Sequence, residues 1–377
     1  MPDDFATQLT IWRHYLHTRP ELSRQEHETA AFVCARLDEL GIPYEAGIGG
    51  HGVVASLKRG GSNRSVGLRA DMDALPIPEA TGKPYASQNP GVMHACGHDG
   101  HTTSLLGAAM LLQNDPDWLG QVHLVFQPAE EGFKGAHAMV EDGLFERFPM
   151  ERIFGYHNWP GLEAGAVMVH PGSVMAGAAN FEINLKGKAG HAGMPHLCVD
   201  PVQGIAQLIV AVNSIVARNL SPVQAGVIST CTLKAGEAQN QVPERASMGG
   251  TIRAFSTDAM DLLKRRLAET AESIAVAFGL EAEIWIGGDL APTGNAPEEA
   301  EMAAAAAQAA GLKVRRDMEP TMGAEDFGCF LADIPGAYAW IGNGPSAGLH
   351  NPAYDYNDEI LPVAARFLAS CAKAALR

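Results

Sequence analysis

The sequence lacks the features that would tie it to a membrane, a nucleic acid or an oxidising compartment. No run approaches the ~18 apolar residues that a membrane-spanning helix requires, and the acidic start at residues 1–4 has no apolar export core. Lysine and arginine number 27 against 43 aspartates and glutamates, and the net charge of −16 disfavours binding to nucleic acid or an anionic membrane. The six cysteines show no short pairing pattern, which is typical of reduced thiols. We therefore expect a soluble, cytoplasmic protein that binds neither nucleic acid nor an anionic membrane.

Length and composition suit a globular protein of two domains. The 377 residues exceed the ~250–300 at which a single hydrophobic core stops growing. The 46% of hydrophobic and 19% of charged residues are ordinary for a soluble chain, so composition alone does not identify a substrate.

Alternating helical and strand patterns predict an α/β fold. Residues 8–40 have apolar positions spaced three and four apart and end at Gly41, which predicts a helix. β-branched and aromatic runs predict strands at 53–57, 65–69, 121–126, 153–158 and 338–341. Strands that alternate with helices imply a mixed sheet with helices on both faces.

The pattern changes between about residues 178 and 289. A strand, a helix, two strands, a helix and a strand follow one another at 180–185, 201–220, 225–233, 247–255, 258–278 and 281–286. This order is the ferredoxin-like unit. We predict that 178–289 is an inserted lid or dimerisation domain, and that 1–177 and 290–377 form one discontinuous domain. Because an open sheet has exposed edges, pairing the edges of two copies would cover them, which predicts a homodimer.

Two short motifs are poor matches to the functions that they formally suggest. Residues 47–52 fit a dinucleotide-binding fingerprint, but a β-branched strand follows where a helix is required, so we expect a hairpin turn. Ser346 lies in a Gly-x-Ser-x-Gly segment, but the residues after it do not start a helix, which argues against a nucleophilic serine.

Residues 93–101 contain one thiol, three imidazoles and a carboxylate, separated by glycines. Cysteine and histidine are donors suited to a transition metal, and glycine allows the backbone to turn several of them inward. A lone Cys-x-His pair is more often an ordinary buried cysteine beside a polar histidine. The metal interpretation therefore requires donors from elsewhere in the chain.

Later segments supply such donors. Glu130 and Glu131 follow one predicted strand, His157 lies near the end of another, and His350 follows the last one. Each donor segment, including that of Cys96 and His98, is expected where a strand gives way to a loop. We expect these segments and Cys96 to meet along one rim of the sheet and to hold one or two divalent ions such as Zn²⁺ or Mn²⁺. Adjacent glutamates in an extended segment point apart, so one would bind metal and the other would act on water, which is a hydrolytic arrangement.

Six segments together resemble one family. They are 69–76, 94–99, 127–132, 186–196, 323–327 and 349–352, reading RADMDALP, HACGHD, QPAEEG, KGKAGHAGMPH, GAEDF and LHNP. In this order, over nearly the whole chain, they resemble the co-catalytic metallopeptidases that include aminoacylase and carboxypeptidase G. The resemblance is strongest to hippurate hydrolases and auxin-conjugate amidohydrolases.

The resemblance implies roles for ten residues. The metal ligands would be Cys96, His98, Glu131, His157 and His350, with Cys96 bridging two ions. Glu130 would move a proton from water to the leaving nitrogen, and Asp73 would orient a ligand. His191 would polarise the scissile carbonyl in the partner subunit, and Asn240 and Arg253 would hold the substrate carboxylate.

Several residues around the ligands could equally have ordinary structural roles. His191 could be a solvated loop residue, Arg253 a surface charge and Asn240 a turn residue, and His101 fits a capping or supporting role better than a ligand. Arg19 stands where relatives commonly carry histidine, and His51 where a small hydroxyl residue is usual.

The implied reaction is metal-dependent hydrolysis of N-acyl amino acids by two divalent ions, Zn²⁺ or Mn²⁺ first and Ni²⁺ or Co²⁺ as alternatives. A dipeptidase or carboxypeptidase would share every catalytic residue. A non-catalytic metal-binding protein is a further alternative, but it would have no use for the additional carboxylate of Glu130.

Overall fold

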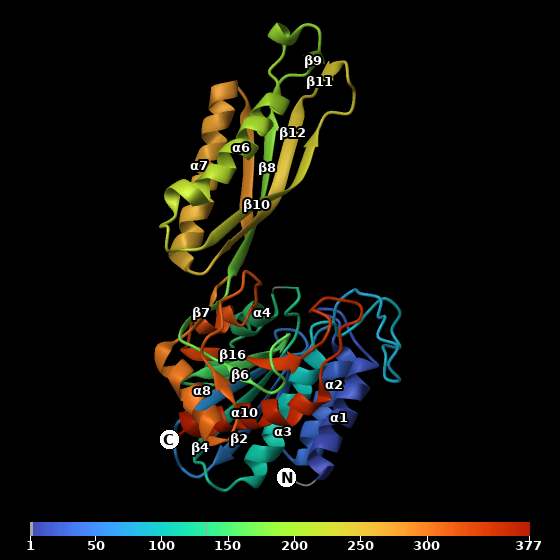
Figure 1. Ribbon diagram of the computed structural model, residues 1–377, viewed down its shortest axis with the longest axis vertical. Coiled ribbons are helices and arrows are strands. Elements are labelled where there is room, and N and C mark those ends of the chain that lie inside the picture. Colours follow the sequence, from blue (N-terminus) through green and yellow to red (C-terminus); the bar gives the residue numbers. More distant parts are fainter. Residues whose placement is uncertain (1–2, 133) are drawn as a thin grey trace. The chain divides into compact units, whose positions relative to one another are not determined.

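The computed structural model describes residues 3–132 and 134–377, which form two compact units (Figure 1). The first unit comprises Met1–Gly172, Gly294–Glu319 and Asp326–Arg377, and the second comprises Ser173–Thr293 and Pro320–Glu325. The segment 178–289, predicted as an insertion, falls within the second unit.

The first unit is built on a mixed eight-stranded sheet with the order β1-β2-β4-β3-β5-β16-β6-β15. The strands are β1 (Tyr44–Ile48), β2 (Gly52–Arg59), β3 (Ser65–Asp71), β4 (Gly120–Gln127), β5 (Ile153–Pro160), β6 (Val167–Met168), β15 (Val314–Arg315) and β16 (Gly336–Gly344). The four central strands β4, β3, β5 and β16 are parallel, so their carboxyl ends share one edge of the sheet. β1 and β2 form an antiparallel hairpin whose turn is at 49–51, which confirms the hairpin expected at 47–52.

The helices of the first unit are α1 (Asp3–His17), α2 (His27–Leu40), α3 (His98–Asn114), α4 (Gly135–Glu141), α5 (Leu144–Arg147), α8 (Pro297–Ala309), α9 (Gly328–Leu331) and α10 (Leu361–Ala375), with a 3₁₀ turn at Asp358–Ile360. The prediction of one helix over 8–40 was wrong, because residues 18–26 separate α1 from α2. Pro20 lies in this break, and proline cannot donate the backbone hydrogen bond that a continuous helix needs.

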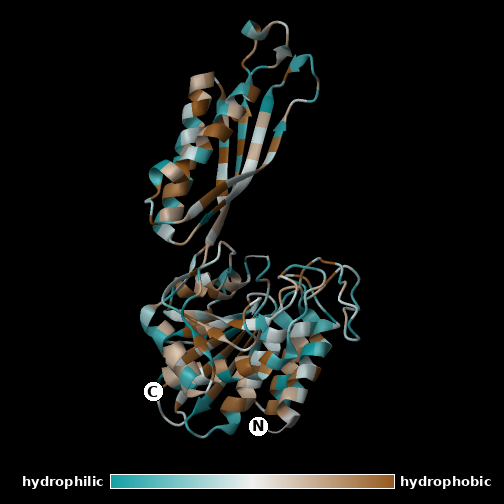
Figure 2. Cartoon of the chain, in the orientation of Figure 1, coloured by the Kyte–Doolittle hydropathy of each residue, from teal (hydrophilic) through white to brown (hydrophobic). Residues whose placement is uncertain are grey.

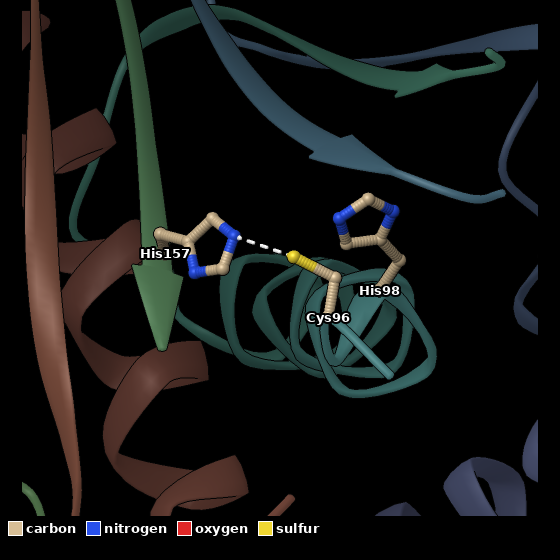
Figure 3. Close-up of side chains that lie close together, drawn as sticks. All are labelled: Cys96, His98 and His157. Atoms are coloured by element: carbon tan, nitrogen blue, oxygen red, sulfur yellow. Dashed lines mark hydrogen bonds between the residues drawn. The ribbon is translucent and has the colours of Figure 1, made fainter. Parts of the chain in front are cut away.

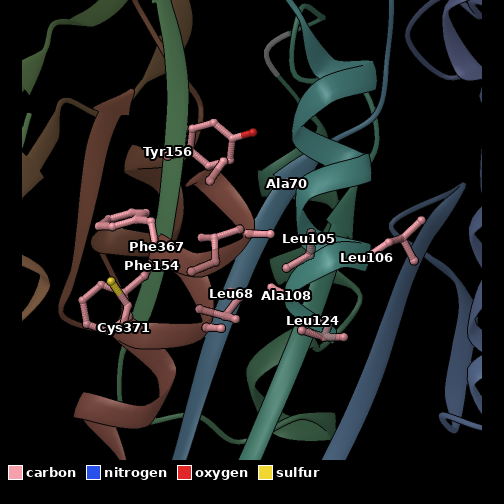
Figure 4. Close-up of a cluster of buried hydrophobic side chains, with 14 of the residues drawn as sticks. Leu68, Ala70, Leu105, Leu106, Ala108, Leu124, Phe154, Tyr156, Phe367 and Cys371 are labelled. Carbon is pink, nitrogen blue, oxygen red and sulfur yellow. The ribbon is translucent and has the colours of Figure 1, made fainter. Parts of the chain in front are cut away.

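Helices cover both faces of the first sheet. On one face, Leu68, Leu124 and Phe154 pack against Leu105 of α3 and Phe367 of α10 in a continuous apolar core (Figure 4). Neighbouring strand residues point to the other face, because side chains alternate along a strand. There, a Cβ on Gly155 would lie 3.0 Å from the ring of Phe327, immediately before α9.

The second unit has the predicted strand and helix order. Its elements are β8 (Gly177–Lys186), α6 (Pro201–Asn219), β10 (Gly226–Ala235), β12 (Arg245–Ala254), α7 (Thr257–Phe278) and β13 (Glu281–Leu290). The antiparallel sheet has the order β10-β12-β8-β13, which confirms the ferredoxin-like arrangement. α6 and α7 cover one face of this sheet, and in both units the hydrophobic residues gather between helices and sheet (Figure 2).

Smaller elements complete the second unit and its connections. β9 (Gly190–His191) pairs with β11 (Gln241–Val242), a 3₁₀ turn covers Pro195–Leu197, and β7 (Gly172–Met175) pairs with β14 (Thr293–Asn295). Of the helices that the structure describes, α6 is the one long and apolar enough to cross a membrane. Its residues Ile205, Leu208 and Val212 are buried in the core of the second unit, as in the core helix of a globular domain.

Candidate metal centre

The first candidate ligands lie at the start of α3. Gly97 has a φ of 92°, a left-handed turn that glycine adopts readily, and it separates Cys96 from His98. His98 is the first residue of the helix. The expectation that each donor segment lies where a strand gives way to a loop was therefore wrong in two places, because His98 opens a helix and His157 lies inside β5.

Two non-glycine residues with left-handed backbone shape the other donor segments. Ala129, just before the paired glutamates, has a φ of 52°, and its N–H donates to Glu26 Oε1 at 2.7 Å. His350 has a φ of 61°, and its N–H donates to the carbonyl of Ala95 at 2.9 Å. Such conformations cost roughly 1–3 kcal/mol and persist only when surrounding contacts hold them. The second bond ties the segment of His350 to that of Cys96.

The donor atoms of the five predicted ligands come together in two overlapping groups. In the first, the donors of Cys96, His98 and His157 lie within 4.8 Å of one another, and Cys96 Sγ is 3.3 Å from His157 Nε2 (Figure 3). In the second, the donors of Cys96, Glu131 and His350 lie within 4.8 Å, with 3.2 Å between Glu131 Oε1 and His350 Nε2. Cys96 is the donor that both groups share.

One buried carboxylate, Asp73, joins two of these ligands, His98 and Glu131, to the neighbouring Glu130. Its Oδ1 is 3.2 Å from His98 Nδ1 and accepts the backbone N–H of Glu130 at 3.1 Å. Its Oδ2 accepts the N–H of Glu131 at 3.0 Å and the hydroxyl of Ser23 at 2.6 Å. A hydrogen bond to Nδ1 leaves Nε2 of the His98 ring to face the metal groups.

Glu130 lies beside the two ligand groups. Its side chain is buried, and its carboxylate lies within 4.8 Å of the donor atoms of His98 and Glu131. A buried carboxylate next to a metal group is placed to accept a proton from water.

The pKa values at the site show which protons a cation would have to displace. Burial, reinforced by nearby carboxylates, raises the pKa of the Cys96 thiol well above its usual value. Burial alone would lower the pKa of His98, but Asp71 and other carboxylates outweigh it and raise that pKa to about 10. Burial and neighbouring imidazoles hold the pKa of His157 well below its usual value, whereas a hydrogen bond to a carboxylate raises that of His350. Because metal ligands are deprotonated, metal affinity should rise with pH.

A buried nitrogen without a hydrogen-bond partner indicates that these residues fit a metal. His98 Nε2 has no hydrogen-bond partner among residues 3–132 and 134–377, and acidic oxygens of Asp71 and Glu131 lie 3.7 and 4.0 Å away. A buried polar atom without a partner is costly, and a bound ion would satisfy it. Thiolate, imidazole and carboxylate together suit Zn²⁺ or a similar divalent ion, so the residues fit.

Three predicted site residues belong to the second unit. His191 is exposed on β9, and its Nδ1 accepts the N–H of Gly193 at 3.0 Å. Asn240 is also exposed, and its carbonyl accepts the N–H of Ala192 at 3.0 Å, so His191 and Asn240 lie on adjoining segments. Arg253 lies on β12, half-buried, and its guanidinium donates to the carbonyl of Ile252 at 3.1 Å.

A pocket of about 800 Å³ lies away from the metal groups. It is lined by Met110, Leu111 and Asn114 at the carboxyl end of α3 and by Arg366 and Lys373 of α10, and none of the predicted site residues lines it. Size alone would favour this pocket as a ligand site, but it lacks the nucleophile, base and metal donors that gather at the other end of α3.

The two departures from the family pattern have local partners. The guanidinium of Arg19 lies 4.2 Å from the centre of the Tyr15 ring, and the ring of His51 lies 4.0 Å from that of His27. Neither residue belongs to a donor group.

Four buried residues lie beside the ligands: Asp71, His101, Asn158 and Tyr354. From the sequence, His101 was expected to have a capping or supporting role, but no role was assigned to the other three. The spacing of His101, three residues after His98 on one helix, was the one signal in the sequence that could have placed it against the ligand groups.

Comparison with known proteins identifies relatives of this chain. The chain is 39% identical to an N-acetyl-L-cysteine deacetylase of Bacillus subtilis, covering 97% of this chain and 88% of that protein. It is 40% identical to a hippurate hydrolase of Campylobacter jejuni, covering 96% and 94%. The solved structure of a dinuclear metal-binding peptidase of the M20 family from Bacillus subtilis superposes with a TM-score of 0.90 at 34% identity, covering 100% and 99%.

A family model points the same way. The model of peptidase family M20/M25/M40 matches residues 67–374, which include every predicted ligand and the whole second unit. The chain therefore belongs to peptidase family M20/M25/M40.

Proposed function

We propose that this protein hydrolyses the amide bond of N-acyl amino acids, releasing a carboxylic acid and a free amino acid. The observation that carries the proposal is the pair of donor groups sharing Cys96, with the carboxylate of Glu130 beside them. N-acetyl and N-benzoyl amino acids are the substrates to expect, because relatives of similar length are named for such compounds.

The proposed ligands of two divalent ions are Cys96, His98, Glu131, His157 and His350, with Cys96 as the bridging thiolate. Zn²⁺ and Mn²⁺ are the first choices and Ni²⁺ or Co²⁺ the alternatives, because the donor set mixes soft and hard atoms. When bound, such ions lower the pKa of water and polarise a carbonyl group.

Glu130 supplies the general base of the proposed reaction. It takes a proton from the attacking water and passes it to the leaving nitrogen, which must be protonated before the amino acid can depart. Asp73 supports this step by fixing the ring of His98 and the backbone of Glu130 and Glu131.

The second unit supplies the substrate contacts in this proposal. His191 donates a hydrogen bond to the scissile carbonyl of a substrate in the partner subunit, which stabilises the developing negative charge. Asn240 and Arg253 bind the substrate carboxylate, for which a guanidinium is well shaped.

We further propose that 178–289 acts as the lid and dimerisation domain of a homodimer, attached to a catalytic domain made of 1–177 and 290–377. The sheet of the second unit ends in the edge strands β10 and β13, and a second copy could cover such an edge. A cytoplasmic location is consistent with six free cysteines.

The test compares Glu130→Gln with the wild-type protein, using Glu146→Gln, an exposed site of the same unit, as the matched control. We expect both variants to keep their metal content, measured by elemental analysis. The kcat for N-acetyl and N-benzoyl amino acids should fall by roughly 10²- to 10⁴-fold for Glu130→Gln alone.

Full activity of the metal-loaded Glu130→Gln protein would refute the mechanism. Faster turnover of free dipeptides than of N-acyl amino acids would favour the dipeptidase alternative, and absence of hydrolysis with metal bound would favour a binding protein.

A further inference from the structure

Next to the first donor group, the one formed by Cys96, His98 and His157, lies a buried series of hydrogen-bonded polar side chains, called the polar chain below. None of them is a predicted ligand. The polar chain begins at Asp71, the last residue of β3, whose Oδ1 is 2.6 Å from His101 Nδ1. The other ring nitrogen of His101, Nε2, lies 2.6 Å from the side-chain amide of Asn158 and accepts the backbone N–H of that residue at 3.2 Å. The Asn158 amide in turn is hydrogen bonded to the hydroxyl of Tyr354 at 2.5 Å. All four side chains are buried.

This chain touches the turn that carries two predicted ligands. A Cβ added at Gly97 would collide with the amide oxygen of Asn158 and would lie 2.7 Å from the Tyr354 hydroxyl. Asn158 and Tyr354 therefore pack directly against the backbone between Cys96 and His98.

The chain also fixes the third member of that group. His157 Nδ1 donates to the carbonyl of Asn158 at 2.7 Å, which leaves Nε2 of the same ring facing Cys96. The ring of His101 packs edge-on against that of His157, with 4.8 Å between their centres, and stacks on that of His98 at 5.4 Å.

Asp71 and His101 could themselves be taken for ligands, because their donor atoms and one of His98 lie within 4.8 Å. The hydrogen bonds argue against this. One oxygen of Asp71 is bonded to His101, and the other accepts from the buried guanidinium of Arg69 at 2.7 Å. Because both oxygens and both nitrogens of the pair already have partners, these residues support the ligands and do not bind the ion.

We propose that Asp71, His101, Asn158 and Tyr354 are positioning residues that set the metal affinity of the Cys96–His98–His157 group. The inference rests on the proposed function, since it assumes that this group binds a metal. The site then has two supports. Asp73 holds the glutamate side and the ring of His98, and this polar chain holds the turn at Gly97 and the ring of His157.

The matched pair Tyr354→Phe and Tyr356→Phe tests the proposal. Each removes one buried hydroxyl from the same segment, but the hydroxyl of Tyr356 is bonded to Tyr156 at 3.0 Å, away from Asn158. Metal-free wild-type and variant proteins are titrated with Zn²⁺ against a chromophoric chelator, and the Co²⁺-loaded forms give the thiolate-to-cobalt absorption band, a spectroscopic reading of Cys96.

We expect the wild type to bind two Zn²⁺. Tyr354→Phe should weaken one of the two by about 3- to 10-fold and shift the Co²⁺ band, because one hydrogen bond to the support is lost. Asn158→Ala should weaken the same ion by about 10- to 100-fold, the usual effect of removing a residue that orients a ligand. Tyr356→Phe should bind both ions within about twofold of the wild type.

If Tyr354→Phe and Asn158→Ala bind both ions with wild-type affinity, the positioning role is wrong. It is also wrong if Tyr356→Phe loses as much Zn²⁺ affinity as Tyr354→Phe, because that result would indicate a general packing effect. If Asn158→Ala does not fold, Tyr354→Phe still decides, because it removes a single oxygen. A wild-type protein that binds no Zn²⁺ would instead refute the proposed function itself.

Discussion

The predicted site residues of the two units are held in different ways. In the first unit, Cys96, His98 and His157 are buried, and carboxylates or backbone carbonyls orient their rings and turns. In the second unit, His191 and Asn240 are exposed on short paired segments, and their hydrogen bonds are mostly to neighbouring backbone. The predicted metal ligands are thus preorganised within one unit. The side chains predicted to bind substrate would instead be ordered by the substrate, at a cost in conformational entropy.

This difference predicts which property a mutation in each unit should change, metal content or substrate binding. A change among the buried ligands should remove the metal and with it all activity. A change in the second unit should leave the metal in place and alter the binding of substrate.

The largest effect should come from Cys96→Ala, which removes the donor common to both groups. We expect loss of at least one ion per protein and a fall in hydrolysis of at least ~10³-fold, since a metal ion supplies several kcal/mol of transition-state stabilisation. Elemental analysis and a rate assay measure both. Cys371→Ala is the matched control, because Cys371 is also buried but lies in α10, outside the donor groups. If the Cys96→Ala protein keeps its metal and its activity, the buried donors of the first unit do not hold the metal on which hydrolysis depends.

A smaller effect is expected from Arg253→Met in the second unit. Loss of the guanidinium should lower kcat/KM by about 10- to 150-fold, mainly through KM, because a hydrogen bond to a charged group contributes ~1.5–3 kcal/mol. Metal content should not change. Arg245→Met on the same strand is the control, since Arg245 forms an exposed pair with Glu283, and such pairs contribute little. If the two variants have equal kcat/KM, Arg253 does not bind the substrate carboxylate.

The donor-rich segments of the first unit could be recognised from residue type, whereas the role of each ligand was implied by the resemblance to the family. A hydrophobic core has no need of a thiol and imidazoles between glycines, as at 93–101, or of paired glutamates directly after a strand. The ferredoxin-like order was predictable because hydrophobic periodicity distinguishes strands of period two from helices of period 3.6. The break at Pro20 was missed because the apolar spacing continues on both sides of it.

The supporting polar chain could not be predicted in the same way. Asn158 and Tyr354 are 196 residues apart, and neither residue type signals a metal site. Their role depends on the close packing of both side chains against Gly97, which is a property of the folded chain and not of any local pattern.

The smallest effect concerns His123, a buried histidine of the first unit outside the metal centre. Its ring is 2.9 Å from the hydroxyl of Ser56 and 3.2 Å from the carbonyl of Pro149, so the neutral form has a partner at each nitrogen. Burial lowers its pKa from 6.5 to about 4. Between these values the unfolded chain binds a proton that the folded protein does not, so the free energy of unfolding falls as the pH falls from 6.5 towards 4.

For His123 alone, this loss amounts to about 2 kcal/mol between pH 7 and pH 5, because one pKa unit corresponds to about 1.4 kcal/mol. Denaturant unfolding of the metal-free protein at both pH values measures it, and His123→Gln should reduce the difference by about that amount. His137→Gln, which changes an exposed histidine, should leave the difference in unfolding free energy between the two pH values unchanged. If His123→Gln leaves the pH dependence unchanged, the imidazole is charged or solvated in the folded state. Burial alone would then not keep a histidine of this unit neutral, and the low pKa of His157 would have to come from the positive charge of its imidazole neighbours at the metal centre.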